Sequence, residues 1–268
     1  LQTVANDVIT LAKTLGADGV EVAGHLGKGF SIDVRGGEVD TLEYDRGKEL
    51  SLTIINGKKK GSASTSDFSA KALSQVVNAA NDFSRYAADD PYTSLPEKSL
   101  LAYQPKVLDT YYPWSIEVSD AIAMAQKMEK TALQVDKQIS QVESAAIASH
   151  ENYYVLANSL DFNIASSGTW HEATCSVIAK DHANNMQRDY DYSVARDWRD
   201  LVSVDKVAKS AGLKAVKRLG AKVIKTQEVP VIFNPICSAS LLSVIVGACY
   251  GSKIYRRSSF LLDKLGEK

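Results

Sequence analysis

The sequence predicts an α+β protein in which antiparallel β-meanders are flanked by helices and followed by the start of a second strand-rich domain. Three observations predict this class. Apolar residues recur at helical spacing in several segments, and apolar and polar residues alternate between those segments. The turn signals Gly36-Gly37 and Asn56-Gly57 separate the alternating runs, and strands joined by such tight turns pair antiparallel.

The first predicted unit covers residues 1–88. A helix is expected at 1–15, because its apolar residues share one face and Gly16 follows as a stop signal. From about Gly19 the period changes to two, which predicts an antiparallel meander. A second helix then follows, and its expected inner face consists of Leu73, Val76, Val77, Ala80 and Phe83.

The same order of elements recurs after a connector. Residues 89–116 contain four of the six prolines and little periodicity, so we expect them to run over the surface as an extended segment. The second unit covers 117–220, with a helix at 117–135, a strand-rich zone at 140–197 and a helix at 203–219. This repetition predicts a structural duplication inside an N-terminal domain that covers 1–225.

The character of the chain changes in the last segment, 226–268. Residues 229–233 are predicted to form a short apolar strand, and Asn234-Pro235 suits the N-cap and first residue of a helix that reaches about residue 250. Because this helix is apolar nearly all round, we expect it to be buried. The segment is therefore predicted to begin a second domain that continues beyond Lys268.

Composition narrows the class of function. The net charge of −1 gives no basic footprint for nucleic acid. The longest apolar run, 241–250, is well short of the roughly 18 residues that span a bilayer. Three cysteines lack metal or redox spacing, so reduced thiols are expected. These features predict a cytoplasmic protein with no membrane partner and no direct nucleic-acid partner.

Most residues that could carry chemistry favour a structural interpretation. The four histidines are scattered, and none has a ligand spacing. His171 and Glu172 are neighbours in a predicted strand, so their side chains should point to opposite faces. Asp189 and Asp191 share a strand face and are expected to form ion pairs with nearby arginines rather than bind a cation. Cys249 has no base in reach by sequence, so no catalytic residue is assigned.

Arg256 and Arg257 leave two interpretations open. Paired arginines suit recognition of a carboxylate, including the C-terminus of a peptide, or an ion pair between subunits. An exposed turn explains them equally well.

Five segments together resemble one known family. Residues 229–262, VPVIFNPICSASLLSVIVGACYGSKIYRRSSFLL, are similar to the equivalent stretch of the TldD/PmbA family. Residues 35–54, 61–69, 173–179 and 186–198 fit the same family, and the resemblance is closer to its TldE/PmbA branch. The family also bears the label "modulator of DNA gyrase". Its full-length members carry a further strand-rich C-terminal domain.

The resemblance implies that this chain lacks the family's zinc site. TldD-like subunits carry an HExxxH motif on the helix before the paired arginines. Aligned on Arg256-Arg257, that motif falls on Ser243, Val244 and Ala248. A hydroxyl, an isopropyl and a methyl group cannot replace two imidazoles and a general base. No metal is therefore expected here, and zinc is expected in the TldD-like partner.

The resemblance further implies a function. The chain would be part of a zinc-free subunit of a heteromeric cytosolic metallopeptidase that processes small peptides, as in microcin maturation and antitoxin degradation. It would form one wall of the peptide chamber beside a TldD-like subunit, or a homodimer when alone. An extended peptide could add a strand to a sheet edge, which the sequence does not identify. The alternative is a regulatory binding protein that acts on DNA gyrase without peptidase activity. An independent hydrolase that uses Cys249 or His171 is least favoured.

Overall fold

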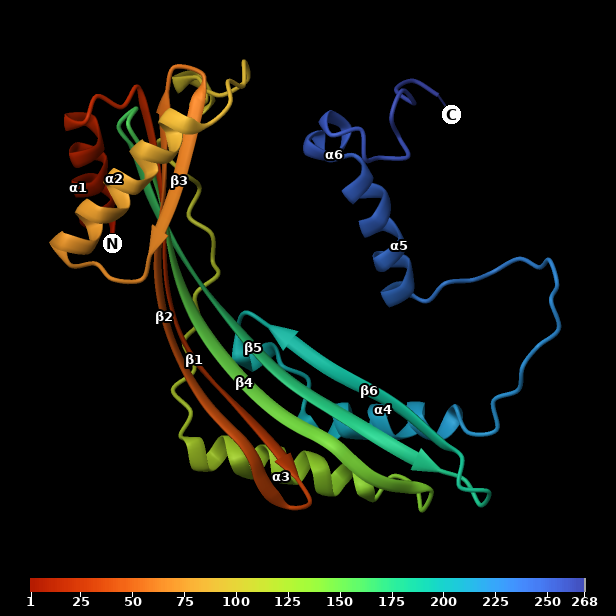
Figure 1. Cartoon of the computed structure of the whole chain (residues 1–268). Coiled ribbons are helices and arrows are strands. Elements are labelled where there is room, and N and C mark those ends of the chain that lie inside the picture. Colours follow the sequence, from red (N-terminus) through yellow and green to blue (C-terminus); the bar gives the residue numbers. More distant parts are fainter. Residues whose placement is uncertain (268) are drawn as a thin grey trace. The chain divides into compact units, whose positions relative to one another are not determined.

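The computed structural model describes residues 1–267, which divide into two compact units. The first unit is Leu1–Ala221, and the second begins at Lys222. The first unit contains one sheet of six antiparallel strands in the order β3-β2-β1-β4-β5-β6 (Figure 1). The predicted α+β class with antiparallel meanders is therefore confirmed.

Each half of the sheet is built from a helix, three strands and a second helix. The first half contains α1 (Gln2–Thr14), β1 (Gly19–Arg35), β2 (Glu38–Asn56), β3 (Lys59–Thr65) and α2 (Ala70–Tyr86). The second half contains α3 (Val118–Leu133), β4 (Ile139–Asn158), β5 (Phe162–Lys180), β6 (Met186–Ala195) and α4 (Val204–Lys217). The halves meet where β1 pairs with β4. The element order thus agrees with the predicted repeat, while a duplication as its origin stays a prediction.

All four helices of this unit cover the same side of the sheet. Side chains alternate between the two sides of a strand, so residues an even number apart share a side. On β1, Val20 and Val22 pack with α1 and α2, whereas Ile32 and Val34 pack with α3. The register of β1 against β2 is regular from Gly19 to Asp33, so Val20, Val22 and Ile32 lie on one side, and Val34, just after the register shift, packs in the same core as Ile32. We call this the helix side and the opposite one the bare side.

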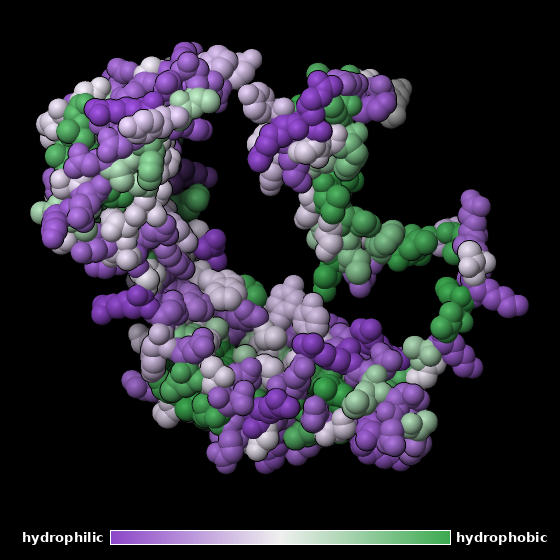
Figure 2. Space-filling view, in the orientation of Figure 1, coloured by the Kyte–Doolittle hydropathy of each residue, from purple (hydrophilic) through white to green (hydrophobic). Residues whose placement is uncertain are grey.

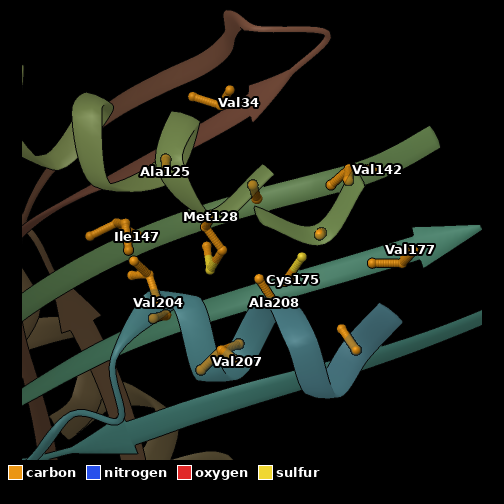
Figure 3. Close-up of a cluster of buried hydrophobic side chains, with 14 of the residues drawn as sticks. Val34, Ala125, Met128, Val142, Ile147, Cys175, Val177, Val204, Val207 and Ala208 are labelled. Carbon is orange, nitrogen blue, oxygen red and sulfur yellow. The ribbon is translucent and has the colours of Figure 1, made fainter. Parts of the chain in front are cut away.

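The two helix pairs enclose two separate hydrophobic cores. One core lies under α1 and α2 and includes Leu50, Leu52 and Val77. The other lies under α3 and α4, where Figure 3 shows Met128 and Cys175 pointing into the space between the helices and the strands. The middle of the sheet between the two helix pairs is left for other parts of the chain to cover.

The connector covers part of that middle and one edge of the sheet. Residues 87–117 contain no strand and a single short 3₁₀ helix, Lys98–Leu100. The backbone N–H of Thr169 on β5 donates to the carbonyl of Thr110 (2.9 Å), and the Thr110 hydroxyl donates to the carbonyl of Ser167 (2.7 Å). The predicted extended connector is thus found lying along β5.

Glu129 of α3 fastens the tip of the β1–β2 hairpin. Its two carboxylate oxygens accept from the backbone N–H groups of Gly36 (2.6 Å) and Gly37 (2.7 Å). Both glycines have positive φ, as the predicted turn requires. The amide of Gln126 also donates to the carbonyl of Gly37 (2.8 Å). A helix of the second half therefore holds the end of the first.

The second unit corrects one prediction about secondary structure. Residues 229–233 do not form a strand, and no regular structure is present from Lys222 to Asn234. A strand needs a neighbour for its backbone hydrogen bonds, and the described chain supplies none to this segment. The predicted helix is present as α5 (Pro235–Ala248), and its Asn234 N-cap accepts from the N–H of Cys237 (2.8 Å).

The predicted burial of α5 is also wrong for the chain as described. Only Ala248 of this helix is buried, and Val244 is 63% exposed. Figure 2 shows apolar side chains gathered along the helix. Its residues are apolar all round, yet the second unit contains only one further short helix, α6 (Gly251–Tyr255), among the described residues. The apolar pattern of α5 is typical of a buried helix, but the described residues of the second unit do not cover it.

Candidate functional site

The three positions that align with the family's zinc motif lie on the last two turns of α5. The hydroxyl of Ser243 donates to the carbonyl of Ala239 within the helix (2.8 Å). Val244 is exposed, whereas Ala248 is buried and its carbonyl accepts from the Ser259 hydroxyl (2.7 Å). Zinc in proteins is held by imidazole, thiolate or carboxylate groups, and these three side chains offer none of them. This donor set does not fit the metal.

The twin arginines follow α6 directly. Arg256 caps the helix, and its Nε donates to the carbonyl of Ser252 (3.2 Å). Arg257 has φ of 55°, so the chain turns sharply there. Both guanidinium groups are exposed, and neither forms an ion pair within residues 1–267. The structure thus shows an exposed turn that carries two unpaired cations, and a contact to a peptide or a subunit stays a prediction.

His171 is a buried structural residue rather than an accessible base. Its Nε2 donates to the carbonyl of Tyr112 (2.9 Å), so its Nδ1 accepts from the Ser149 hydroxyl (2.9 Å). Trp114 packs edge-on against the ring. Burial lowers the pKa of His171 and keeps the imidazole neutral. His171 therefore joins the connector to the helix side of the sheet.

Glu172 lies on the bare side and accepts from the hydroxyl of Thr174. The prediction that His171 and Glu172 point to opposite faces is confirmed. Cys175 is fully buried, and burial raises the pKa of its thiol to about 12, which leaves no thiolate at neutral pH. Cys249 is exposed at the end of α5.

The strand face of Asp189 and Asp191 forms ion pairs, as predicted, but with cations that the sequence did not single out. Asp191 pairs with Lys214 (3.0 Å) and Asp189 with Arg218 (3.3 Å), both from α4. Arg188 lies on the other side of β6 and pairs with Glu143 (2.6 Å). Alternation along β6 placed the aspartates correctly, whereas the α4 partners depend on tertiary packing.

Among the hollows of the first unit, two border the middle of the sheet. One, of about 510 Å³, lies on the helix side between the two helix pairs and is lined by Leu26, Gly27, Lys28, Arg46, Gly47, Lys48, Glu151 and Tyr153. The other, of about 770 Å³, lies between connector residues 105–108 and strands β1, β2, β4 and β5, and is mostly apolar. Neither was predicted from the sequence, because each combines residues from distant strands.

The 510 Å³ hollow is rich in cations. Lys28 pairs with Glu151 (2.9 Å), which also accepts from the Tyr111 hydroxyl (2.5 Å). Although burial opposes ionisation of Glu151, these two hydrogen bonds hold its pKa below the usual value. Lys48 lies over the ring of Phe68, 5.1 Å from its centre, and Arg46 forms no ion pair within residues 1–267. The hollow therefore has more positive than negative charge.

The described residues contain no group of three or more His, Cys, Asp or Glu side chains arranged to hold a metal ion. No helix among residues 1–267 is long and apolar enough to cross a membrane.

Three family models match the chain in order. The PmbA/TldA metallopeptidase domain 1 matches residues 20–82, the central domain matches 111–219, and the C-terminal domain matches 226–268. The C-terminal match coincides with the second unit, and the other two matches lie within the first.

Curated relatives and solved structures agree with these matches. The chain is 35% identical to Metalloprotease PmbA of Escherichia coli O157:H7 over 94% of its length, and 32% identical to a PmbA homolog of Haemophilus influenzae over 100%. It spans 56% and 59% of those relatives.

Two solved structures share the fold. A Bacteroides thetaiotaomicron protein described as a candidate modulator of DNA gyrase superposes with a TM-score of 0.91 at 24% identity, over 99% of this chain and 61% of that one. TldE from Thermococcus kodakarensis superposes with a TM-score of 0.82 at 19% identity, over 99% and 59%. On the family models and the curated relatives together, the chain belongs to the PmbA/TldD metallopeptidase family.

Proposed function

We propose that this chain is part of a zinc-free, TldE/PmbA-like subunit of a two-component cytoplasmic metallopeptidase that processes small peptides. In this proposal the TldD-like partner carries the zinc and the general base. The present chain contributes a wall of the peptide chamber and contacts that orient an extended peptide.

One observation carries the proposal. The chain belongs to a metallopeptidase family, yet the α5 positions that align with the zinc motif hold Ser243, Val244 and Ala248. A metal-bound water needs nitrogen, sulfur or carboxylate ligands and a nearby base, and these residues supply neither. Family membership without the ligand set supports a companion role.

The twin arginines are the proposed contact for a peptide carboxylate or the partner subunit. Their guanidinium groups are exposed and carry no ion pair within the described chain. A guanidinium binds a carboxylate through two parallel hydrogen bonds, which fixes orientation as well as position.

The decisive experiment uses the full-length protein, alone and mixed with a TldD-like subunit. We expect peptidase activity only in the mixture, with loss on chelation, and zinc bound to the partner when each subunit is analysed for metal. Cys249→Ser should leave the activity of the mixture unchanged. Activity of the lone chain that resists chelation, or zinc bound by this subunit, would overturn the proposal. Binding to DNA gyrase without any need for the partner would favour the regulatory alternative.

A matched pair of variants tests the arginines. Arg256→Ala should weaken processing of peptides with a free C-terminal carboxylate by roughly tenfold, and should leave amidated peptides unaffected. Lys253→Ala removes a cation from the same short helix and serves as the control. Equal loss for both kinds of peptide would point to a contact between subunits instead.

A further inference from the structure

Within residues 1–267, residues 38–49 of β2 form a strand edge with no neighbour on the side away from β1. β3 pairs only with residues 50–56 of β2 and ends at Thr65, after which the chain turns toward α2. Within residues 1–267, no other backbone hydrogen-bonds to this part of β2 on the side away from β1. Every residue from 38 to 49 is exposed. We call residues 38–49 the open edge.

The corresponding edge in the second half is covered. β6 pairs only with residues 171–180 of β5, which leaves 162–170 beyond its end. There the connector lies alongside, and Thr110 both accepts from and donates to the β5 backbone. An extended segment therefore fits beside a long strand of this sheet where the edge strand stops short. In the first half, the described chain provides no such segment.

The open edge has two chemically different sides. On the helix side it presents Leu42, Tyr44, Arg46 and Lys48, since these alternate in register with the buried Leu50 and Leu52. On the bare side it presents Glu43, Asp45 and Glu49. A strand added here would place its alternate side chains next to Arg46 and Lys48, at the border of the cation-rich 510 Å³ hollow.

Charge distinguishes this edge from the outer edge of β6, which also has no neighbouring strand in the described part of the chain. The charged residues of β6 already have partners, because Arg188 pairs with Glu143, and Asp189 and Asp191 pair with α4. Arg46 has no ion pair within the described chain. The open edge as a whole has five carboxylates and two cations, but both cations, Arg46 and Lys48, lie on its helix side, so that side attracts acidic side chains.

We propose that the open edge binds an extended peptide by β-strand addition, with acidic side chains at alternate positions facing Arg46 and Lys48. The proposal rests on the proposed function in taking the occupant to be a peptide, and it adds the place of binding and the preferred pattern. Main-chain hydrogen bonds would hold peptides of many sequences, while the two cations would select acidic residues on one side. Residues on the other side of the peptide would face Glu43 and Asp45, which favours neutral or basic ones.

Direct binding to the full-length protein tests the proposal without any need for catalysis. The probe is a fluorescent peptide in which glutamate alternates with threonine, and its counterpart has glutamine in place of glutamate. We expect the acidic peptide to bind more tightly than its neutral counterpart, and the difference to shrink as salt is raised. Hydrogen exchange should slow at residues 38–49 in the complex and should stay unchanged at β6.

Charge variants provide the matched control. Arg46→Glu should weaken binding of the acidic peptide by roughly tenfold, because an attraction becomes a repulsion, while Arg46→Lys should retain it. Lys58→Glu makes the same change of charge at the far turn of β2 and should have no effect.

Three outcomes would overturn the proposal: equal binding of both peptides, protection of β6 instead of the open edge, or a variant Arg46→Glu that binds normally. Loss of assembly with the TldD-like subunit in Arg46→Glu, with peptide binding intact, would assign the edge to the subunit interface. If the protein binds the peptide but shows no peptidase activity with its partner, only the proposed function is contradicted, and the binding site at the open edge stands.

Discussion

The two halves of the sheet contain the same elements but complete their edges differently. In the second half, the connector lies against residues 162–170 of β5 where β6 stops short. In the first half, residues 38–49 of β2 extend beyond β3 with nothing beside them in the described chain. An uncovered strand edge tends to pair with another chain, so proteins usually cover or charge it.

The difference teaches that the same strand arrangement can serve either stability or recognition. The covered half joins its connector to the sheet through Thr110, Thr169 and His171, and the charged residues of its edge strand β6 are paired. The open half keeps Arg46 unpaired beside a hollow of about 510 Å³. Four predictions test this contrast, from the largest expected effect to the smallest.

The largest effect is expected where each half brings a helix against its neighbours through a glycine. A Cβ at Gly61 of β3 would lie 2.2 Å from the backbone of Ala80 and Ser84 in α2. Gly61→Ala should therefore lower the free energy of unfolding by about 3 kcal/mol, because the backbone of α2 must move. The measurement is chemical denaturation.

Gly212→Ala in α4 is the matched change in the second half. Its Cβ would meet Val135 and Ile139 side chains at 3.0 Å, and alanine favours a helix over glycine by about 1 kcal/mol. We expect a change below about 1 kcal/mol. Similar losses for the two variants would show that the halves tolerate added volume equally.

The second prediction concerns the cover over β5. The Thr169 hydroxyl accepts from the N–H of Tyr112 (2.9 Å) and donates to the carbonyl of Arg196 (2.6 Å). Thr169→Val leaves both backbone groups without their partner, so it should cost about 2 kcal/mol. Hydrogen exchange should accelerate at residues 162–170, making this edge resemble the open one. Thr41→Val on exposed β2 is the control, and unchanged exchange at β5 would contradict the prediction.

The third prediction is a pH dependence of the covered half. The folded-state pKa of His171 lies below its ordinary value of 6.5 because of burial, although the Tyr112 carbonyl and the charges of Asp197 and Glu151 oppose the shift and His150 adds to it. The unfolded chain therefore binds more protons below about pH 6.5, so stability present above that pH is lost as the pH falls, by at most about 1.4 kcal/mol per pH unit.

His171→Gln isolates this contribution. Glutamine can keep both hydrogen bonds, to the Tyr112 carbonyl and from the Ser149 hydroxyl, without a titrating group. The difference in the free energy of unfolding between the native protein and the variant should shrink between pH 7 and pH 5, by denaturation at each pH. A constant difference would show that protonation of His171 is not linked to folding.

The smallest effect separates a paired surface cation from an unpaired one. Arg188 pairs with Glu143 at 2.6 Å on an exposed surface, so Arg188→Ala should cost no more than about 0.5 kcal/mol. Arg46→Ala should change the free energy of unfolding by less, since Arg46 has no ion pair in the described chain. A larger cost for Arg46 would mean that this side chain serves folding rather than binding.

Local patterns predicted most elements of the first unit. Period-two alternation located β1, β2 and β6, the signals Gly36-Gly37 and Asn56-Gly57 located two turns, and apolar stripes located the four helices. The prediction of a strand at 229–233 was wrong. An apolar run shows only that burial of the segment is favourable, whereas a strand also needs a neighbouring strand.

The site was less predictable than the fold. Residue identity alone showed that Ser243, Val244 and Ala248 cannot be zinc ligands. The open edge depends instead on how far β3 extends along β2, and the hollow combines β1, β2 and β4. Such features depend on where each strand ends and on which residues it pairs with. The alternation of apolar and polar residues in the sequence specifies neither.

The two hydrogen bonds that Glu129 accepts from Gly36 and Gly37 have a consequence for peptide binding. They anchor the far end of the β1–β2 arm to a helix of the other half, so the arm is supported at both of its ends. Binding of a ligand to a preorganised strand costs less conformational entropy than binding to a flexible hairpin that must first become ordered. One buried carboxylate, more than ninety residues away in the chain, would thereby set the affinity of a surface that it never touches.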